Sequence, residues 1–518
     1  MKRVKPKMLV FSHICSPQYV TGAEKLLLFM IRELLPSFHC TLVVPNEGVI
    51  AANARKLGIT VIVHNIPLIV PLYLALPQMQ DEIAATERGS AWYDLAKLID
   101  GERPNIIIAN TCVHPLPAIV GKALGIPVIW SVMETLRDTA HTPMAASIIE
   151  QYSDYVIGIS ESTLAPLHTP GIQAKSTLIP PSWQQEELSP SSWSMHRINR
   201  RRQLAIADHQ RLVGYISSSI FEAKGLEHFM QMAVNTAVQV PHAMYLIVGN
   251  PVDDGYFNRC LDIARERGLM ERFRWVRFEE QVESIYPAMD LLVVPSLTIE
   301  GFGMTALEGM VFGKAVVSYG SGGLSEIGRA TGNEAFTVPT GDTAILTSTV
   351  SSLLADDAAL QAIGARNAQA AHAVYGIAAY RERLRRFVEQ LGVRGYAPLT
   401  LVKSNGSPAI YLYEGGVLRM IRSMNLLQRT GYRIEEARVL PDAVIAAWPK
   451  GAPIGTALRR SRRRKRGGSW LGRLRRRRKS GRTGRTGRAG RRRLRGGGSG
   501  SGRRSKRAAG GGQRPRRR

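Results

Sequence analysis

Short apolar runs recur along most of this chain, separated by stretches with a helical pattern. The runs are rich in valine and isoleucine, and short runs of this kind bounded by turn residues are typical of buried strands. They cover residues 8–11, 41–45, 61–63, 105–110, 128–132, 155–160, 212–216, 245–250, 273–276, 291–294 and 315–318. Strands that alternate with helices indicate parallel sheets with helices on both faces. Such sheets bind ligands at the carboxyl ends of their strands.

The pattern breaks once, where residues 180–202 hold three prolines, two tryptophans and few aliphatic side chains. A chain of 518 residues is long enough for two large domains with additions. We therefore expect an α/β protein with two Rossmann-like, doubly wound domains that face a central cleft. The first covers residues 1–185 and the second 206–393, including a final crossover helix, and a linker covers 186–205.

A different pattern of short segments begins after the second domain. Turns at Asn405-Gly406 and Gly415-Gly416 separate apolar runs, which indicates a small β-hairpin module over residues 397–454. A helix is expected near residues 423–430. The pattern faintly resembles a small β module of bacterial surface and cell-wall proteins, which implies a role in binding or positioning.

The net charge of +28 is concentrated at the C-terminal end of the chain. Residues 451–518 hold 28 lysines and arginines and no acidic residue, which leaves 41 basic and 41 acidic residues elsewhere. Residues 458–518 are mostly arginine, glycine and serine, so we expect a disordered basic tail. Such a tail could contact anionic membrane headgroups or, non-specifically, nucleic acid. It could also carry no selected function.

The four cysteines, Cys15, Cys40, Cys112 and Cys260, lie among apolar neighbours without metal-binding spacing. We expect buried free thiols, and neither disulfides nor a zinc site. No apolar run is long enough for a membrane span, and the first residues carry no secretory pattern. These features predict a soluble, cytoplasmic protein.

Residues 295–308, P-S-L-T-I-E-G-F-G-M-T-A-L-E, follow an expected buried strand and lead into a helix. Gly301 and Gly303 let the backbone approach a ligand closely, and Glu300 and Glu308 place two carboxylates beyond the strand. This arrangement suits a polyhydroxy ligand whose phosphates are held nearby. Alternatively, residues 305–308 fit the capping-box pattern, in which Glu308 would cap its own helix.

Polar residues also follow other strands of the expected sheets. In the first half these are His13, Gly22, Thr111 and Glu134. In the second half Lys224 lies near a helix start, where its charge would add to the helix dipole and stabilise a leaving diphosphate. A solvated surface lysine is the alternative. Glycines in the loop 320–326 could approach a nucleotide, or could only turn the chain.

Several short motifs follow one another along residues 8–391. They are Thr21-Gly22-Ala23-Glu24, Val213-Gly214, Lys224-Gly225, the pair Glu300 and Glu308, Gly322-Gly323 and Glu326-Ile327. Together they resemble the retaining glycosyltransferases of family 4, which have the two-domain GT-B architecture. The resemblance implies an enzyme that moves a sugar from a nucleoside diphosphate sugar to a hydroxyl acceptor, in bacterial cell-envelope polysaccharide or glycan biosynthesis.

The resemblance also implies roles for individual residues. Glu300 would face the transferred sugar, Glu308 would bind the ribose hydroxyls, and Lys224 would bind the diphosphate. The catalytic candidates are Glu300, Lys224 and His13, and the donor-binding candidates are Gly22, Gly214, Lys224, Gly301, Phe302, Gly303, Glu308 and Gly323. The family mechanism needs no metal or other cofactor. The acceptor would be a glycan, lipid-linked or protein hydroxyl, and the enzyme would be cytoplasmic or peripheral to the inner face of the plasma membrane.

Two residues depart from the family pattern. Tyr215 stands where many members have an arginine, so one cationic partner of the diphosphate is missing. Met133 stands where many members have a histidine, which His13 or His114 could replace. These departures leave open a catalytically weak or inactive protein that binds nucleotide or glycan. A protein that associates with nucleic acid or membranes through its tail is a further alternative.

Overall fold

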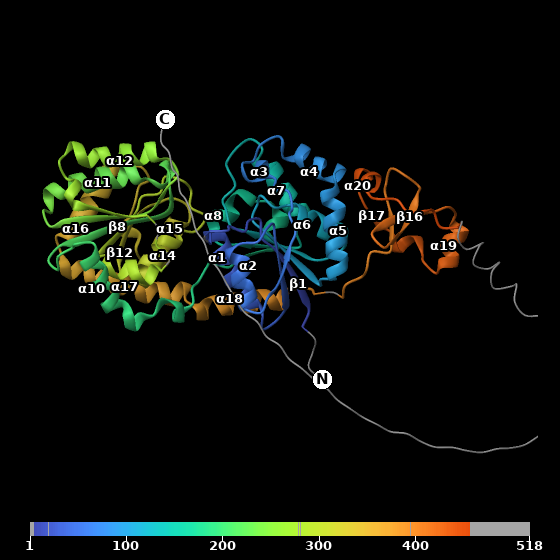
Figure 1. Ribbon diagram of the computed structural model, residues 1–518, viewed down its shortest axis with the longest axis horizontal. Helices are drawn as coiled ribbons and strands as arrows, with labels where there is room; N and C mark the ends of the chain where they lie inside the picture. Colours follow the sequence, from blue (N-terminus) through green and yellow to red (C-terminus); the bar gives the residue numbers. More distant parts are fainter. Residues whose placement is uncertain (1–4, 19, 278, 280, 394, 456–518) are drawn as a thin grey trace, which may run out of the picture. The chain divides into compact units, whose positions relative to one another are not determined.

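The computed structural model describes residues 5–18, 20–277, 279, 281–393 and 395–455 (Figure 1). The basic tail predicted for residues 458–518 lies outside them. Within the described residues the chain forms a seven-stranded and a six-stranded parallel sheet, followed by a four-stranded mixed sheet. The predicted α/β class with two doubly wound domains and an added β-rich module is confirmed.

The first domain is built on the seven-stranded sheet, whose strands follow the order β3-β2-β1-β4-β5-β6-β7. The strands are β1 (Lys7–Phe11), β2 (His39–Val44), β3 (Thr60–Val63), β4 (Ile106–Asn110), β5 (Val128–Val132), β6 (Tyr155–Gly158) and β7 (Ser176–Leu178). The helices are α1 (Gly22–Leu34), α2 (Val49–Lys56), α3 (Val70–Tyr73), α4 (Met79–Arg88), α5 (Ser90–Glu102), α6 (Leu116–Ala123), α7 (Thr142–Gln151), α8 (Glu161–Leu164) and α9 (Pro170–Gln173). Apolar residues of α1 and α2 cover one face of the sheet, and those of α4 to α7 cover the other. The central strand β4 is therefore buried along its whole length.

The second domain repeats this arrangement with the strand order β10-β9-β8-β11-β12-β13. The strands are β8 (Arg211–Ile220), β9 (Ala243–Pro251), β10 (Phe273–Val276), β11 (Leu291–Val294), β12 (Ala315–Tyr319) and β13 (Thr337–Val338). The helices are α10 (Trp193–Gln203), α11 (Leu226–Gln239), α12 (Asp254–Glu266), α13 (Val282–Ile285), α14 (Met304–Val311), α15 (Gly323–Thr331), α16 (Thr343–Leu354), α17 (Asp357–Tyr375) and α18 (Ile377–Gln390). The last helix, α18, buries Tyr380, Leu384 and Phe387 in the core of the first domain. It is the predicted crossover helix.

The predicted module is the third sheet, with the order β16-β15-β14-β17. Its elements are β14 (Leu401–Lys403), β15 (Ile410–Glu414), β16 (Val417–Ile421), α19 (Met424–Thr430), β17 (Arg438–Val439) and α20 (Asp442–Ala447). The expected hairpin joins β15 to β16 through Gly415 and Gly416, which both have positive φ, a conformation that suits glycine. The sequence does not predict β17 or α20, because both are short and carry no clear periodicity.

The module packs against the first domain and shares its core. The Trp448 ring lies 5.8 Å from the Trp92 ring and 6.2 Å from the Tyr93 ring, and it belongs to the same buried cluster as the helices of that domain. Tyr396 donates a hydrogen bond of 2.5 Å to Asp100 Oδ1. The module is thus an extension of the first domain.

Three elements differ from the sequence prediction. Strand β8 continues to Ile220, past an irregularity between Ile216 and Ser219, where the sequence predicts a loop from residue 217. Helix α15 begins at Gly323, inside the predicted loop 320–326. Helix α10 occupies most of the predicted linker, because its arginines find fixed partners in the second domain.

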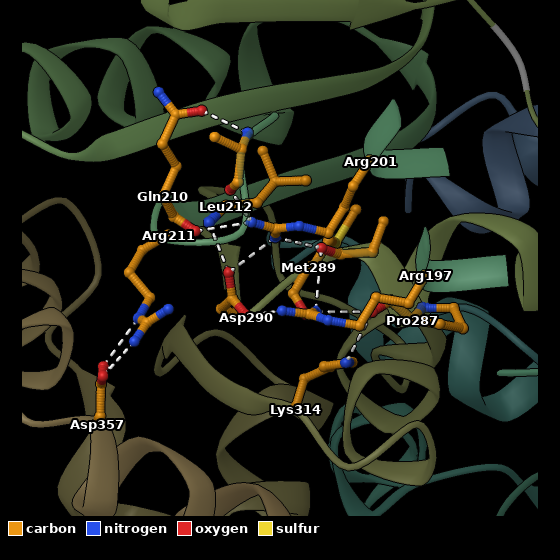
Figure 2. Close-up of polar contacts among 12 residues, drawn as sticks. Arg197, Arg201, Gln210, Arg211, Leu212, Pro287, Met289, Asp290, Lys314 and Asp357 are labelled. Carbon is orange, nitrogen blue, oxygen red and sulfur yellow. Dashed lines mark hydrogen bonds and ion pairs between the residues drawn. The ribbon is translucent and has the colours of Figure 1, made fainter. Parts of the chain in front are cut away.

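These arginines anchor α10 beside the start of β11 (Figure 2). Arg201 is buried and donates to Asp290 Oδ2 at 3.2 Å and to two nearby backbone carbonyl oxygens at 2.7 and 2.8 Å. Arg197 donates to Asp290 Oδ1 at 2.6 Å, and the backbone N–H of Leu212 donates to Asp290 Oδ2 at 2.8 Å. Because Asp290 directly precedes β11, this network fixes the strand that leads to Glu300.

The four cysteines are buried and free, as predicted. Burial raises the pKa of Cys40 to about 12 and that of Cys260 to about 11, so both thiols stay protonated at neutral pH. In the part of the chain that the structure describes, no helix combines the length and the apolar character needed to cross a membrane.

Candidate functional site

Glu300 and Lys224 are in direct contact at the carboxyl end of the second sheet. Glu300 Oε1 accepts a hydrogen bond of 2.6 Å from Lys224 Nζ and one of 2.7 Å from Ser296 Oγ. The two paired side chains remain 20% and 27% exposed, so a ligand can reach them. Lys224 also precedes α11 closely, and its charge adds to the partial positive charge of that helix N-terminus. The structure therefore brings two of the predicted catalytic residues together.

Two loops interlock to hold this pair. The loop before α11 pairs with the loop after β11 through a hydrogen bond of 2.9 Å from Leu297 N to Ala223 O. Gly225 has a φ of +72°, and a Cβ atom at this position would clash with the carbonyl oxygen of Pro295. Only glycine allows this close approach, so the Lys224-Gly225 motif has a structural cause.

A second glycine pair packs on the other side of Glu300. Gly323 N donates to Glu300 O at 2.8 Å, and Gly322 forms an isolated parallel bridge with Glu300. A Cβ atom on Gly322 would meet the backbone of Glu300, and one on Gly323 would meet the backbone of Phe302. Loop packing therefore accounts for a glycine at both positions.

Glu308 does not cap its helix, so the capping-box prediction is wrong. The N-cap of α14 is Gly303, and no side chain caps the helix. Glu308 Oε2 instead accepts a hydrogen bond of 2.9 Å from the hydroxyl of Tyr286, and Oε1 accepts one of 3.1 Å from Lys25 Nζ. Burial, and then the nearby Glu308, raises the pKa of Tyr286 far above its usual value, so this hydroxyl remains a donor. Tyr286 thus fixes the Glu308 carboxylate.

A complete capping box does occur at the start of α1. Thr21 Oγ1 accepts from Glu24 N at 3.3 Å, and Glu24 Oε2 accepts from Thr21 N at 2.8 Å. Glu24 Oε1 also accepts from Ser16 N at 3.0 Å, which ties the preceding loop to the helix. Gly22 is the first residue of α1, and a Cβ atom there would face open space. A ligand can therefore approach the backbone at this helix start.

Four other donor-binding candidates are explained by packing. Phe302 is 4% exposed and packs edge-on against Tyr375, with the ring centroids 5.4 Å apart. A Cβ atom on Gly214 would clash with the sulfur of Met289 inside the second sheet. At Gly301 the space is tight, since a Cβ atom would lie 2.7 Å from the Met133 carbonyl oxygen. Gly303 has a φ of +106°, a backbone conformation that favours glycine.

The two residues that depart from the family pattern both point into the protein. Tyr215 is 1% exposed, its ring centroid lies 5.4 Å from that of Phe229, and its hydroxyl donates to Lys224 O at 3.2 Å. It therefore positions the backbone of Lys224, and an arginine there would be buried in the core. Met133 is buried in the same apolar cluster as Phe302.

The third catalytic candidate, His13, lies in a polar cluster at the carboxyl ends of β1, β4 and β5. Burial lowers the pKa of His13 to about 4, and burial together with His13 lowers that of His114 to about 3. Burial raises the pKa of Glu134 to about 7, although Glu134 Oε2 accepts a hydrogen bond of 3.3 Å from Cys112 N. The structure brings His13 together with His114, as a group in the first domain.

Sequence patterns do not identify Lys25, Ser296 or Tyr286, although each binds one of the two glutamates. Lys25 and Glu308 are 283 positions apart, and neither lies in a motif that links them. Ser296 lies within the 295–308 segment, but serine is common in loops. Glu326 of the Glu326-Ile327 motif accepts hydrogen bonds of 2.7 Å from the backbone N–H groups of residues 161 and 162 in the first domain.

The segment that carries the Lys224–Glu300 pair can be compared with known families. Residues 196–370 match the family model of glycosyl transferases group 1. The match begins within α10 and ends within α17, so it includes both interlocked loops and Glu308.

Curated relatives agree with this match. The chain is 34% identical over 151 residues to the 2-deoxystreptamine N-acetyl-D-glucosaminyltransferase of Streptomyces fradiae. The aligned segment covers 28% of this chain and 34% of that protein. It is 31% identical over 134 residues to the lipopolysaccharide 1,2-N-acetylglucosaminetransferase of Salmonella typhimurium. That aligned segment covers 25% of this chain and 35% of the Salmonella protein. The chain thus matches about a third of the length of these relatives.

Solved structures extend the likeness to both domains. The structure of Anabaena HepE in complex with UDP and glucose has a TM-score of 0.61 and 18% identity, and covers 74% of this chain and 100% of HepE. The glycosyltransferase WaaG, involved in lipopolysaccharide biosynthesis, has a TM-score of 0.53 and 12% identity, and covers 74% of this chain and 100% of WaaG. These likenesses confirm the predicted two-domain fold.

Proposed function

We propose that this chain is a retaining glycosyltransferase of family 4, which moves a sugar from a nucleoside diphosphate sugar to a hydroxyl acceptor. The observation that carries the proposal is the Lys224–Glu300 pair, held by two interlocked loops within the segment that matches glycosyl transferases group 1. The likeness to HepE, which was solved with UDP and with UDP-glucose, supports a nucleotide-sugar donor.

The donor would lie with its diphosphate beside Lys224 and the N-terminus of α11. Negative charge develops on the diphosphate as the glycosidic bond breaks, and a fixed lysine and helix dipole stabilise that charge without reorganisation. Glu300 would turn from Lys224 towards the transferred sugar, and Glu308, fixed by Tyr286, would accept hydrogen bonds from the ribose hydroxyls. The acceptor hydroxyl would attack from the face on which the diphosphate leaves. We expect no metal requirement.

The proposals for the acceptor and for the location in the cell rest on the named relatives and on the charge of the chain. Relatives that act on lipopolysaccharide and in O-antigen biosynthesis support a role in cell-envelope polysaccharide assembly. A cytoplasmic enzyme that is peripheral to the membrane would fit such a role. Contact of residues 458–518 with anionic membranes or nucleic acid is a proposal that rests on their basic sequence alone.

The test is incubation of the full chain with a panel of UDP-, GDP- and ADP-sugars, with and without simple glycoside acceptors, while nucleotide release is measured. We expect release from one class of donor, and a loss of roughly a hundredfold or more in rate for Glu300→Gln, since a preorganised charged partner is removed. The matched control is Glu266→Gln, on the exposed surface of α12, which should keep the full rate. Equal rates for the two variants, or no release from any donor, would refute the proposal.

A further inference from the structure

Strand β3 forms one edge of the first sheet, and its outer side has no neighbouring strand. Among the described strands it pairs with β2 alone. Just past the strand, the N–H of His64 donates to Val44 O at 2.8 Å on the β2 side, and backbone groups alternate in direction along a strand. The N–H and C=O groups of Val61 and Val63 therefore point away from the sheet, where a further strand can pair with them.

The other sheet edges carry features that block such pairing. Natural edges are protected by very short strands, by charged side chains or by a covering segment. In the part of the chain that the structure describes, β7 has three residues and directly follows Lys175, β13 and β17 have two residues each, and β10 contains Arg274. The edge strand β16 forms parallel bridges with Lys450 and Ile454. Strand β3, with the sequence T-V-I-V, has none of these features.

The chain around β3 also lacks fixed charges and exposes apolar side chains. Residues 57–80 hold no lysine, arginine, aspartate or glutamate. Leu57, Val63, Leu68 and Val70, called the β3 strip below, are each 40% to 46% exposed. The other three lie within seven positions of Val63, which limits their distance from it to roughly 25 Å. Exposed apolar side chains that gather in one region of a surface mark a contact with another molecule.

The partner at this edge has to supply a strand, because the outward groups of β3 are backbone N–H and C=O. The apolar core of a lipid bilayer offers them no hydrogen bonds. Residues 458–518 are mostly arginine, glycine and serine, so they have few strand-forming side chains and would bring charge to an uncharged surface. A second copy of β3 supplies both the backbone groups and a matching uncharged, apolar strip.

Two copies of β3 can pair in an antiparallel arrangement about a two-fold axis. Val61 of each copy would then lie opposite Val63 of the other, and the two residues would exchange N–H···O bonds. A two-fold contact is self-complementary and closes, so it uses both edges and leaves none for further chains. Two strands of four residues are too small for a stable dimer, which buries roughly 1,200 Å² or more. The β3 strip supplies the additional apolar contact.

We propose that this chain forms a homodimer through the β3 edge, with the first sheets of two copies joined across a two-fold axis and the β3 strip buried between them. The contacts between the first and second domains are made elsewhere, at Lys25, Met133 and residues 161–162. None of these contacts involves β3, so the dimer leaves the Lys224–Glu300 pair accessible. The inference does not depend on the proposed glycosyltransferase function.

Sedimentation velocity of the full chain over a range of concentrations tests the dimer. We expect wild type to show a monomer–dimer equilibrium. Val63→Lys should weaken dimerisation by roughly a hundredfold or more, because it brings like charges together across the two-fold axis. The matched control is Val238→Lys, on α11, where the valine is 74% exposed, and it should dimerise as wild type does. A wild type that stays monomeric, or equal dimerisation of the two variants, would overturn the inference.

Leu68→Lys is a second variant, because it lies outside the strand and leaves the pairing of β3 with β2 intact. It should weaken dimerisation by roughly tenfold or more, again through like charges at the interface. Circular dichroism of each variant should match that of wild type. Dimerisation of a folded Leu68→Lys chain with wild-type affinity would count against burial of the β3 strip.

A distance measurement between spin labels locates the interface. The four native cysteines are buried, so a label on Lys56→Cys, at the exposed end of α2, reports on the β3 edge. We expect a short, defined distance between two copies, and a longer one for a label on Val238→Cys. A shorter distance at Val238 would place the dimer contact elsewhere and overturn the inference. Monomers that bind phosphatidylcholine vesicles through Val63 would overturn it too, by assigning the β3 strip to a membrane.

Discussion

Individual side chains at the site act through their neighbours, and Tyr215 is the clearest example. Its buried ring packs against Phe229 and its hydroxyl holds Lys224 O. Tyr215→Phe should lower the free energy of unfolding by about 1 kcal/mol, the value of one buried hydrogen bond. Tyr215→Arg should lower it by about 3 kcal/mol or more, because an unpaired charge enters the core. Urea titrations of both variants check this, and an arginine variant as stable as wild type, with faster turnover, would show that the position faces the diphosphate.

Glu134 gives the stability of the protein a defined dependence on pH. Burial raises its pKa from 4.5 to about 7, so between these values the folded state binds more protons than the unfolded state. The free energy of unfolding therefore falls as pH rises through this window. Glu134→Gln removes the ionisation, so the stability of wild type minus that of the variant should fall by up to about 3 kcal/mol between pH 4.5 and 8. Urea titrations at a series of pH values measure the difference, and a constant difference would contradict the assignment.

The sequence predicts the residues of the site better than their roles. Glu300 and Glu308 can be placed at a strand end because carboxylates and glycines follow an apolar run there. Lys224 can be placed because it lies near an expected helix start. The sequence cannot show that Glu308 pairs with Tyr286 and Lys25, since the motif fits a capping box equally well. Glycines are the least informative residues: a nucleotide loop and a packed loop need the same absence of a side chain, as Gly323 illustrates.

Among the elements, α10 depends most on one buried network. Asp290 joins Arg197, Arg201 and the N-terminal end of β8. Asp290→Asn leaves the buried Arg201 without its counter-charge and should lower the free energy of unfolding by about 3–5 kcal/mol. The control is Asp262→Asn on α12, whose ion pair with Arg265 is about half exposed and should contribute about 1 kcal/mol or less. Guanidinium titrations compare the two, and similar small losses would mean that α10 is held mainly by apolar packing.

Elements were predictable where the apolar pattern is strong. Strands β5 and β11 have the predicted apolar cores, since continuous runs of buried residues fit only a sheet covered on both faces. The sequence does not predict β7, because this strand is only three residues long and half-exposed. It does not predict α10 either, because that helix is mostly polar and is held by salt bridges to other elements. Both depend on partners far along the chain, which local patterns cannot show.

At the scale of the whole molecule, the C-terminal module and the first domain share one core. Gly125, with a φ of +68°, leaves room for the guanidinium of Arg438, which donates to Ala397 O at 3.1 Å. The Trp448 indole donates to Gly416 O at 3.2 Å and is surrounded by aromatic rings of both parts. Such a shared core couples two parts into one cooperative unit, so the module should unfold together with the first domain.

Trp448→Ala should uncouple them. Removing a buried tryptophan costs about 3–5 kcal/mol, and here the loss falls on the contact between module and domain. We expect wild type to show protection of residues 396–455 from protease until the first domain unfolds, and the variant to be cleaved in this region at temperatures where the domain is still folded. Met424→Ala, a half-exposed side chain on α19, is the matched control and should keep full protection. If the Trp448→Ala module stays protected as long as the domain does, the remaining contacts at Tyr396, Asp100 and Arg438 suffice to hold it, and the tryptophan contributes stability without coupling.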